Sequence, residues 1–287
     1  MQYTVDEHFV SQFIINRFSD SQEQVGFINI KKNEPVIRTS KSTAICFCKD
    51  MYEIKNTDGT YFERNSTENR YAAIEAEISG KLEPMIAKLH LGGRLSAEDN
   101  AYLAVLLALQ LVRVPMMKRV IYKKEQYEQN AVRQLEQNST YKMMIDSVDS
   151  GILYLRQNGF NLSEETIQQI RNTTKHKQSL LEEVICYIEE KCAFYIVTTN
   201  RNHFVLSDRP VLIDTYDNTK YIFPIDLKHA IICAVCEIDQ NIDWGYLNMI
   251  EDTTVDEINQ FSYENSENLV MFHPDDSSYA LSICRKK

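Results

Sequence analysis

Residues 101–117 read AYLAVLLALQLVRVPMM, and this apolar run decides the fold class. Before it, Leu91-Gly92-Gly93 interrupts the helical pattern. Ser96, with Asp99 three positions later, is typical of a helix start. The pattern predicts one long helix over 96–138. That helix must kink near Pro115, because proline lacks the backbone N–H and its ring displaces the preceding turn.

Outward from this run, periodicity predicts further helices over 67–90, 140–157 and 163–190, and others over 5–19 and 254–266. Alternating, β-branched segments predict strands over 24–31, 35–39, 43–48, 193–198, 203–206, 220–225, 229–237 and 278–284. Strands therefore flank a large central helical portion. We expect an α+β fold with one mixed sheet formed by the N- and C-terminal strand segments. Residues 1–287 should be a single compact domain with a helical subdomain over about 65–190.

Composition limits the class of protein. With 287 residues the chain can bury a sizeable core, and 44% hydrophobic with 25% charged residues is ordinary for a globular protein. A net charge of −10 argues against a general polyanion-binding protein but leaves room for a local basic groove. The run Ala101–Val112 is too short and too polar to span a bilayer comfortably, so no membrane partner is expected.

The seven cysteines are odd in number and lie in apolar, strand-like segments. A disulfide framework would favour an even number in a small secreted chain, so we expect reduced thiols and a cytoplasmic protein. Cys233 and Cys236 form the one C-x-x-C pair. They would point to opposite faces of a strand, which disfavours a zinc site.

Arg113 is the clearest physical anomaly, since nearly all its neighbours favour burial. A buried guanidinium needs an anionic partner or a hydrogen-bond network. One interpretation is a structural ion pair with a helix carboxylate, and the other is a role in receiving a substrate phosphate or carboxylate. On the helix over 67–90, Glu75 and Glu77 point about 200° apart. Periodicity favours Glu75 as the inward residue.

Two polar motifs begin and end this arrangement. His8 lies one helical turn before Gln12, and its imidazole can serve as a base or a ligand. Ser207 and Asp208 follow a short apolar strand, at a place where side chains project from a sheet. They either cap a turn or supply a carboxylate that binds metal.

These motifs, together with Arg113-Val114-Pro115 and Phe223-Pro224-Ile225, resemble the bacterial family catalogued as domain of unknown function 4238. The resemblance spans nearly the whole chain, and Ser-Asp-x-Pro at 207–210 is its most recognisable signature. Some members occur among anti-phage defence genes. The resemblance therefore implies a cytoplasmic defence or stress effector.

Our leading hypothesis is a nuclease-like hydrolase that acts on nucleic acid or a nucleotide. Five residues would converge on its catalytic pocket: His8, Gln12, Glu75, Arg113 and Asp208. In a metal-dependent version Glu75 and Asp208 hold Mg²⁺ or Mn²⁺, while Arg113 steadies phosphate and His8 activates water. Substrate binding would fall to Ser207, Lys118 and Arg119. The opposing hypothesis is a non-catalytic sensor for a nucleotide or a phage component.

Arg171 and His176 carry a rival signal. Their spacing has the Arg-polar-x-x-x-His form of a metal-independent ribonuclease, in which arginine holds phosphate and histidine handles protons. A weaker signal is the stretch 101–124, which has five basic residues and no acidic one. It is either a solvated helix end or one wall of a groove for phosphates.

Overall fold

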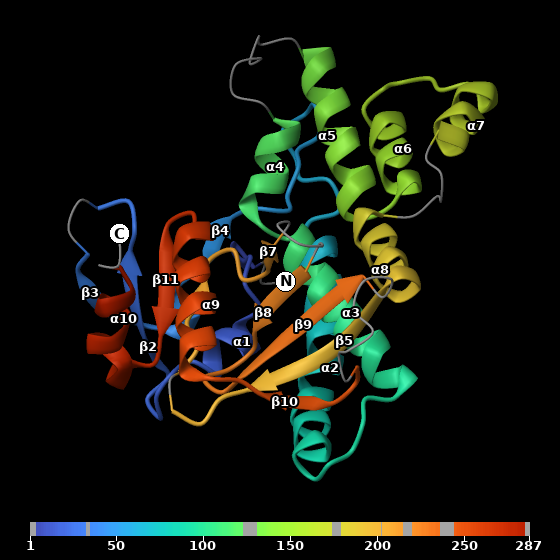
Figure 1. Ribbon diagram of the computed structural model, residues 1–287. Helices are drawn as coiled ribbons and strands as arrows, with labels where there is room; N and C mark the ends of the chain where they lie inside the picture. Colours follow the sequence, from blue (N-terminus) through green and yellow to red (C-terminus); the bar gives the residue numbers. More distant parts are fainter. Residues whose placement is uncertain are drawn as a thin grey trace.

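A computed structural model describes residues 4–32, 35–122, 131–173, 179–201, 203–214, 220–235 and 244–284 (Figure 1). The fold is α+β, as the sequence predicts, with helices packed around mixed sheets. The described α-helices are α1 (Gln12–Asn16), α2 (Ser66–His90), α3 (Ala97–Val112), α4 (Pro115–Ile121), α5 (Ala131–Ile145), α6 (Val148–Gln157), α7 (Glu164–Thr173), α8 (Leu180–Lys191), α9 (Asp252–Asn265) and α10 (Ser277–Cys284).

The described strands fall into three sheets. Their bounds are β1 (Asp6–His8), β2 (Gln24–Asn29), β3 (Ile37–Lys41), β4 (Phe47–Lys49), β5 (Cys192–Thr198), β6 (Leu206–Ser207), β7 (Leu212–Asp214), β8 (Lys220–Pro224), β9 (His229–Val235), β10 (Leu247–Met249) and β11 (Leu269–Phe272). A five-stranded sheet has the order β10-β5-β9-β8-β7, a four-stranded sheet has the order β3-β2-β11-β6, and β1 pairs with β4. Only β10 and β5 are parallel among these pairs.

The four-stranded sheet joins the two ends of the chain, as expected for the N- and C-terminal strand segments. β2 and β3 come from the first part of the chain and β6 and β11 from the last. Gly26 in β2 lies opposite Phe272 in β11, and a Cβ at Gly26 would come within 2.5 Å of that ring. Glycine at this position therefore leaves the space that the phenyl ring of Phe272 occupies. The expectation of one mixed sheet is wrong in its number of sheets. The strands predicted over 193–198, 220–225 and 229–237 form a separate five-stranded sheet with β7 and β10, and this sheet is the one that mixes parallel and antiparallel pairs.

Helices α2 and α3 pack together, and α3 and α8 pack against β5 of the five-stranded sheet (Figure 1). The largest cluster of buried apolar side chains runs through this interface, from Phe9 to Met271. α2 contains Pro84, where one backbone hydrogen bond of the helix is missing. The single-domain prediction and the predicted helical subdomain stay predictions.

The predicted helices over 96–138, 140–157 and 163–190 are wrong as single elements. The region of 140–157 holds the end of α5 and all of α6. α3 begins where predicted, but it ends at Val112, and α4 starts at Pro115 after a bend of 55°. Val114 is extended, with ψ 146°, because the ring of the following proline disfavours helical backbone at the residue before it. The region of 163–190 holds α7 and α8, which are separate helices.

Both ends of the chain also differ from prediction. Residues 5–19 are not one helix, because Asp6–His8 pairs with Phe47–Lys49 and only Gln12–Asn16 is helical. Residues 278–284 are helical rather than a strand. In α10 the buried residues are Ala280, Ile283 and Cys284, which is helical spacing. Short strands β7, β10 and β11 lie outside the predicted segments.

In the described part of the chain no single helix is long and apolar enough to cross a membrane. α3 and α4 together pass that test by length and composition, but the 55° bend separates them.

Candidate functional site

The end of α3 places Arg113 inside the protein. α3 starts with a capping box, in which Asp99 N–H donates to Ser96 Oγ at 3.1 Å and Ser96 N–H donates to Asp99 Oδ2 at 2.7 Å. It stops just before Arg113, since Pro115 begins the next helix. The Arg113 side chain is 2% exposed.

The guanidinium of Arg113 donates to protein acceptors on several elements. It forms an ion pair with Glu75 and donates through Nη2 to the carbonyl of His8. Nε donates to the Tyr52 hydroxyl at 3.2 Å, and Nη1 lies 3.4 Å from Ser11 Oγ. The predicted ion pair with a helix carboxylate is therefore confirmed. A role in steadying phosphate stays a prediction, and it would require the phosphate to displace these acceptors.

Ser11 links this ion pair to α3. Its hydroxyl donates to Glu75 Oε1 at 2.5 Å and accepts from Gln110 Nε2, while its backbone N–H donates to Gln110 Oε1 at 3.2 Å. The Glu75 side chain is 18% exposed, whereas Glu77 lies at the surface and accepts from the Tyr102 hydroxyl at 3.1 Å. The prediction that Glu75 is the inward residue is confirmed.

His8 contributes to this network through its backbone carbonyl rather than its ring. The imidazole packs against Phe47, with ring centroids 6.0 Å apart, and its Nε2 is buried without a hydrogen-bond partner in the described structure. Burial and the nearby Arg113 charge lower the pKa of His8. Gln12 is the first residue of α1 and is half-buried. The catalytic roles predicted for His8 and Gln12 stay predictions.

Asp208 organises the turn before β11. Its carboxylate accepts the backbone N–H groups of residues 267–269 at 2.7, 2.8 and 3.2 Å, and burial raises its pKa. Ser207 Oγ accepts the N–H of Arg209 at 2.9 Å. These contacts are those of the turn-capping interpretation. Asp208 and Glu75 share no hydrogen-bond partner in the described ranges, so their joint metal-binding role stays a prediction.

The predicted substrate-binding residues Lys118 and Arg119 line a cleft of about 600 Å³ between α4 and the segment that follows β4. We call it the α4 cleft, and its lining residues are Cys48, Lys49, Asp50, Met51, Glu53, Ile54, Lys55, Tyr61, Pro115, Lys118, Arg119, Tyr122, Gln134 and Asn138. Four cations thus face two carboxylates. The cleft is more basic than expected for a chain of net charge −10.

The four cations of the α4 cleft differ in their contacts with protein groups and in their exposure to solvent. Lys118 Nζ donates to the carbonyls of residues 50, 51 and 53 at 3.2, 2.7 and 3.3 Å, and Arg119 forms a two-pronged ion pair with Glu267. Lys49 and Lys55 are exposed, and Lys55 Nζ lies 5.1 Å from the centre of the Tyr61 ring. The two exposed lysines are the groups best placed to meet an anion from solvent.

A buried carboxyl group, that of Glu7, lies near this cleft. Glu7 is fully buried; its Oε2 accepts the Tyr52 N–H at 2.8 Å, and its Oε1 has no partner in the described structure. Burial raises the pKa of Glu7 to about 8, and the neighbouring charges of Glu53 and Glu68 act in the same direction. Glu7 is therefore protonated over much of the neutral range.

A second polar cluster joins α1, α2 and the end of β8, and sequence reasoning missed it. Arg17 Nε donates to the Ile225 carbonyl at 3.0 Å, and Nη2 donates to Asp226 Oδ2 at 2.6 Å. Arg17 also pairs with Glu83 of α2. The available signal was the position of Ile225 in the motif Phe223-Pro224-Ile225, directly before Asp226.

This cluster continues into two histidines. His229 Nδ1 lies 3.0 Å from both Asp226 carboxylate oxygens, and His229 Nε2 lies 2.8 Å from His90 Nε2. Burial opposes ionisation of Asp226, but the hydrogen bond and charge of His229 outweigh it and hold the pKa of Asp226 at about 2. Asp226 is therefore a carboxylate at neutral pH.

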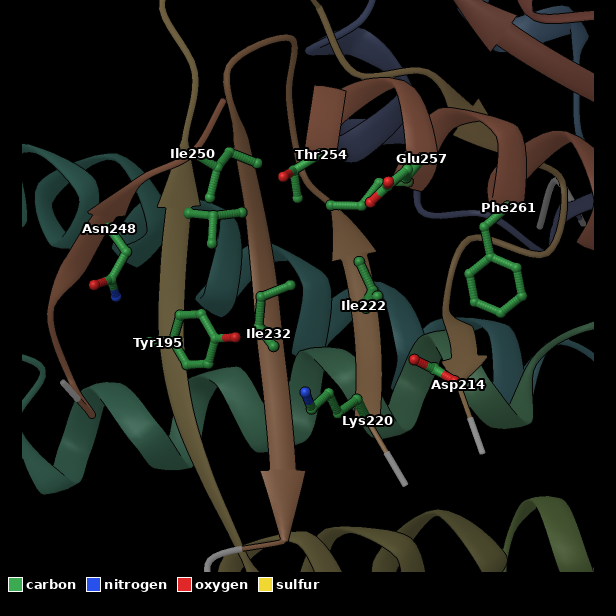
Figure 2. Close-up of a pocket in the computed structure, with 12 residues that line it drawn as sticks. Tyr195, Asp214, Lys220, Ile222, Ile232, Asn248, Ile250, Thr254, Glu257 and Phe261 are labelled. Atoms are coloured by element: carbon green, nitrogen blue, oxygen red, sulfur yellow. The ribbon is translucent and has the colours of Figure 1, made fainter. Parts of the chain in front are cut away.

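A cavity of about 730 Å³ lies on the face of the five-stranded sheet turned away from α2 and α3 (Figure 2). Its floor is apolar, with Ile222, Ile232 and Ile250, and α9 covers one side. Among the described lining residues Lys220 is the only cation, against the carboxylates of Asp214 and Glu257. All five strands contribute, so no contiguous motif marks this cavity in the sequence.

The rival ribonuclease pattern is only partly visible. Arg171 pairs with Asp149, with Nη2–Oδ1 at 2.8 Å, and His176 lies outside the described residues. Lys123 and Lys124 of the basic stretch, and Cys236 of the C-x-x-C pair, also lie outside them. Within the described ranges no group of three or more His, Cys, Asp or Glu side chains is arranged to hold a metal ion.

Comparison with known proteins gives one match. No curated protein and no solved structure matches the chain. The family model described as "Protein of unknown function (DUF4238)" matches residues 7–276, which include the Arg113 network, the Asp208 turn and both histidines of the second cluster. The chain therefore belongs to the DUF4238 family.

Proposed function

We propose that this protein binds a nucleotide, or another phosphorylated small molecule, in the α4 cleft, and that it acts as a defence or stress effector in the bacterial cytoplasm. The observation that carries the proposal is the concentration of Lys49, Lys55, Lys118 and Arg119 around one 600 Å³ cleft in an acidic protein. Small-molecule sites commonly have volumes of roughly 300–1,000 Å³.

Charge distinguishes this cleft from the other candidate sites. A phosphate group is bound by cationic side chains that can exchange their bound water for contacts with its oxygens. In the sheet-face cavity Lys220 is outnumbered by the carboxylates of Asp214 and Glu257. At the Arg113 network the guanidinium is buried and already bound to protein acceptors. The α4 cleft combines volume with exposed cations.

Within the cleft, we assign phosphate contact to Lys49 and Lys55, which are exposed. Arg119 is held by Glu267 and would add its charge at the edge of the site. Lys118, fixed by three carbonyls, shapes the wall. Because the exposed charges are screened by salt, the affinity should fall as ionic strength rises.

Binding is tested by calorimetry with ATP, GTP and inorganic pyrophosphate. Reversing two charges in the Lys49→Glu/Lys55→Glu variant should weaken binding by about tenfold or more, which corresponds to ~1.4 kcal/mol. Lys220→Glu, which reverses the lysine of the sheet-face cavity, is the matched control and should bind like the parent. Dependence on Lys220 instead of the two cleft lysines, or no saturable binding, would overturn the proposal.

A second measurement distinguishes a hydrolase from a non-catalytic sensor. Incubation of the bound compound and of RNA with Mg²⁺ or Mn²⁺, followed by chromatography, detects product if the protein is the nuclease-like hydrolase. Binding without product supports the non-catalytic sensor. If product forms only without chelator, metal acts in the reaction, and the predicted pair Glu75 and Asp208 becomes the first pair to substitute.

A further inference from the structure

His90 and His229 meet although 139 positions separate them in the sequence. His90 ends α2 and is exposed, while His229 begins β9 with a side chain 12% exposed. The rings are nearly perpendicular, at 81°, and their centroids are 5.1 Å apart. Their Nε2 atoms, the ring nitrogens farthest from the backbone, point at each other over 2.8 Å.

Asp226 determines which nitrogen of His229 carries the hydrogen. Its oxygens lie 3.0 Å from Nδ1, so Nδ1 donates and Nε2 is left with its lone pair. Asp226 is itself fixed by the backbone N–H groups of Lys228 and His229, both at 2.7 Å, and by Arg17. A carboxylate that holds one nitrogen of an imidazole while the other faces outward is the usual support of a metal-binding histidine.

In the neutral pair, His90 Nε2–H donates to the Nε2 lone pair of His229. When the His90 hydrogen moves from Nε2 to Nδ1 through solvent, both Nε2 lone pairs become available to a metal ion, and neither imidazole has to ionise. With metal–nitrogen bonds of about 2.0–2.1 Å in tetrahedral geometry, the two nitrogens must separate to roughly 3.3 Å. His229 is held by Asp226, so the exposed His90 would make this small adjustment.

We propose that His90 and His229 together bind one divalent transition-metal ion, with Asp226 as the positioning residue and water in the remaining coordination positions. Paired imidazoles favour Zn²⁺, Ni²⁺ or Cu²⁺ over Mg²⁺ or Mn²⁺, which prefer oxygen ligands. The nearby cations are directed elsewhere. Arg17 is paired with Glu83 and Asp226, and Lys228 Nζ donates to the carbonyls of residues 200 and 201.

The site is independent of the α4 cleft, and its test needs no nucleotide. Zn²⁺ binding to the metal-free full chain is measured by calorimetry at neutral pH, and Cu²⁺ is used in a second experiment that reads nitrogen ligation by electron paramagnetic resonance. We expect one saturable site with two imidazole nitrogens. His90→Ala and His229→Ala should each weaken binding more than tenfold, and Asp226→Asn should weaken it by about 10–100-fold.

His203→Ala is the matched control, because His203 is also paired with a carboxylate, Asp276, through Nδ1 at 2.6 Å. It should bind Zn²⁺ like the parent, since an Asp–His pair alone supplies only one ligand. Thermal melting without metal confirms that each variant folds, and Asp226→Asn needs this check because Asp226 also holds Arg17. The proposal is wrong if the parent shows no saturable site, or if binding survives both alanine substitutions.

Discussion

The Arg113 network and the His90–His229 pair are both polar contacts between segments far apart in the sequence, yet they differ in access to solvent. Arg113 is 2% exposed and bound to acceptors from several elements. The histidines lie at the end of a helix and the start of a strand, and His90 is exposed. A sealed network of this kind holds a fold together. An accessible pair of imidazoles can exchange the hydrogen bond between them for two bonds to a metal ion.

The contrast between the two sites also explains why the most conspicuous residue is a poor guide to chemistry. Arg113 stands out in the sequence because charge is rare in an apolar run. The same rarity requires the protein to satisfy that charge with its own groups, here Glu75 and Ser11. Residues such as His229 and Asp226 stand out less, since each is ordinary in its local sequence.

The largest expected effect on stability comes from the buried Arg113 network. Arg113→Leu should lower the free energy of unfolding by roughly 3–5 kcal/mol, because it leaves the Glu75 carboxylate without its cation. Urea denaturation measures this loss. The double variant Arg113→Leu/Glu75→Gln should recover part of it, since no unpaired charge remains.

Added nucleotide should not restore the stability of Arg113→Leu by a greater margin than it stabilises the parent, because the partner of Arg113 is the protein itself. A loss below about 1 kcal/mol, or specific rescue by nucleotide, would mean that Arg113 belongs to a ligand site after all.

A smaller effect concerns pH. Glu7 has a folded-state pKa of about 8, above its ordinary value of 4.5, so the folded protein binds more protons than the unfolded chain between these values. Its contribution to stability is full below the unfolded pKa and is lost as pH rises towards 8. For each pH unit by which the folded-state pKa exceeds the unfolded-state pKa, the protonated group contributes about 1.4 kcal/mol to the free energy of unfolding. We expect the parent to lose at least ~1.4 kcal/mol more than Glu7→Gln between pH 5 and 8.

Glutamine at position 7 keeps an oxygen for the Tyr52 N–H and never ionises, so it is a close mimic of the protonated acid. The difference between the two denaturation profiles cancels the titration of all other groups. Parallel profiles would show that Glu7 has an ordinary pKa and that its surroundings admit water.

The smallest expected effect on stability comes from the accessible His90–His229 pair. His90→Ala removes an exposed side chain and one hydrogen bond, so it should change the unfolding free energy by about 0.5 kcal/mol or less without metal. With Zn²⁺ in excess, the parent should melt at a higher temperature than without it, and His90→Ala should show little gain. A large loss of stability in the metal-free variant would place His90 among the structural contacts and erase the contrast with Arg113.

Sequence patterns located much of the helical part, for local reasons. The Ser96–Asp99 capping box identified the start of α3, and it involves only neighbouring residues. The end of the same helix was placed too late, because a proline can either kink a helix or end it. Here Val114 is extended and the helix ends. For α10, a short apolar run fits either strand or helix, and only packing in the folded protein decides between them.

The candidate sites divide in the same way. Periodicity identified Glu75 as inward, because a helix face can be read from spacing, and the apolar neighbours of Arg113 indicated its burial. The choice between an ion pair and a substrate contact for Arg113 was left open by the sequence. The pairing of His90 with His229 depends on how α2 crosses the five-stranded sheet, which spacing does not contain. The α4 cleft was half visible: Lys118 and Arg119 were identified, but Lys49 and Lys55 reach it from a different part of the chain.

The proline within α2 has a mechanical consequence. Glu75 and His90 lie on this one helix, about 22 Å apart along its axis. Pro84 lies between them, and because proline has no backbone N–H, one hydrogen bond of the helix is missing there. The half with Glu75 is held by Arg113, and the half with His90 is held by the buried side chains of Met85, Ile86 and Leu89. The two halves of α2 are therefore fixed separately, one in the Arg113 network and one in the apolar core. The missing backbone hydrogen bond at Pro84 lies between them, so a small adjustment at His90 can be taken up at Pro84 without moving Glu75.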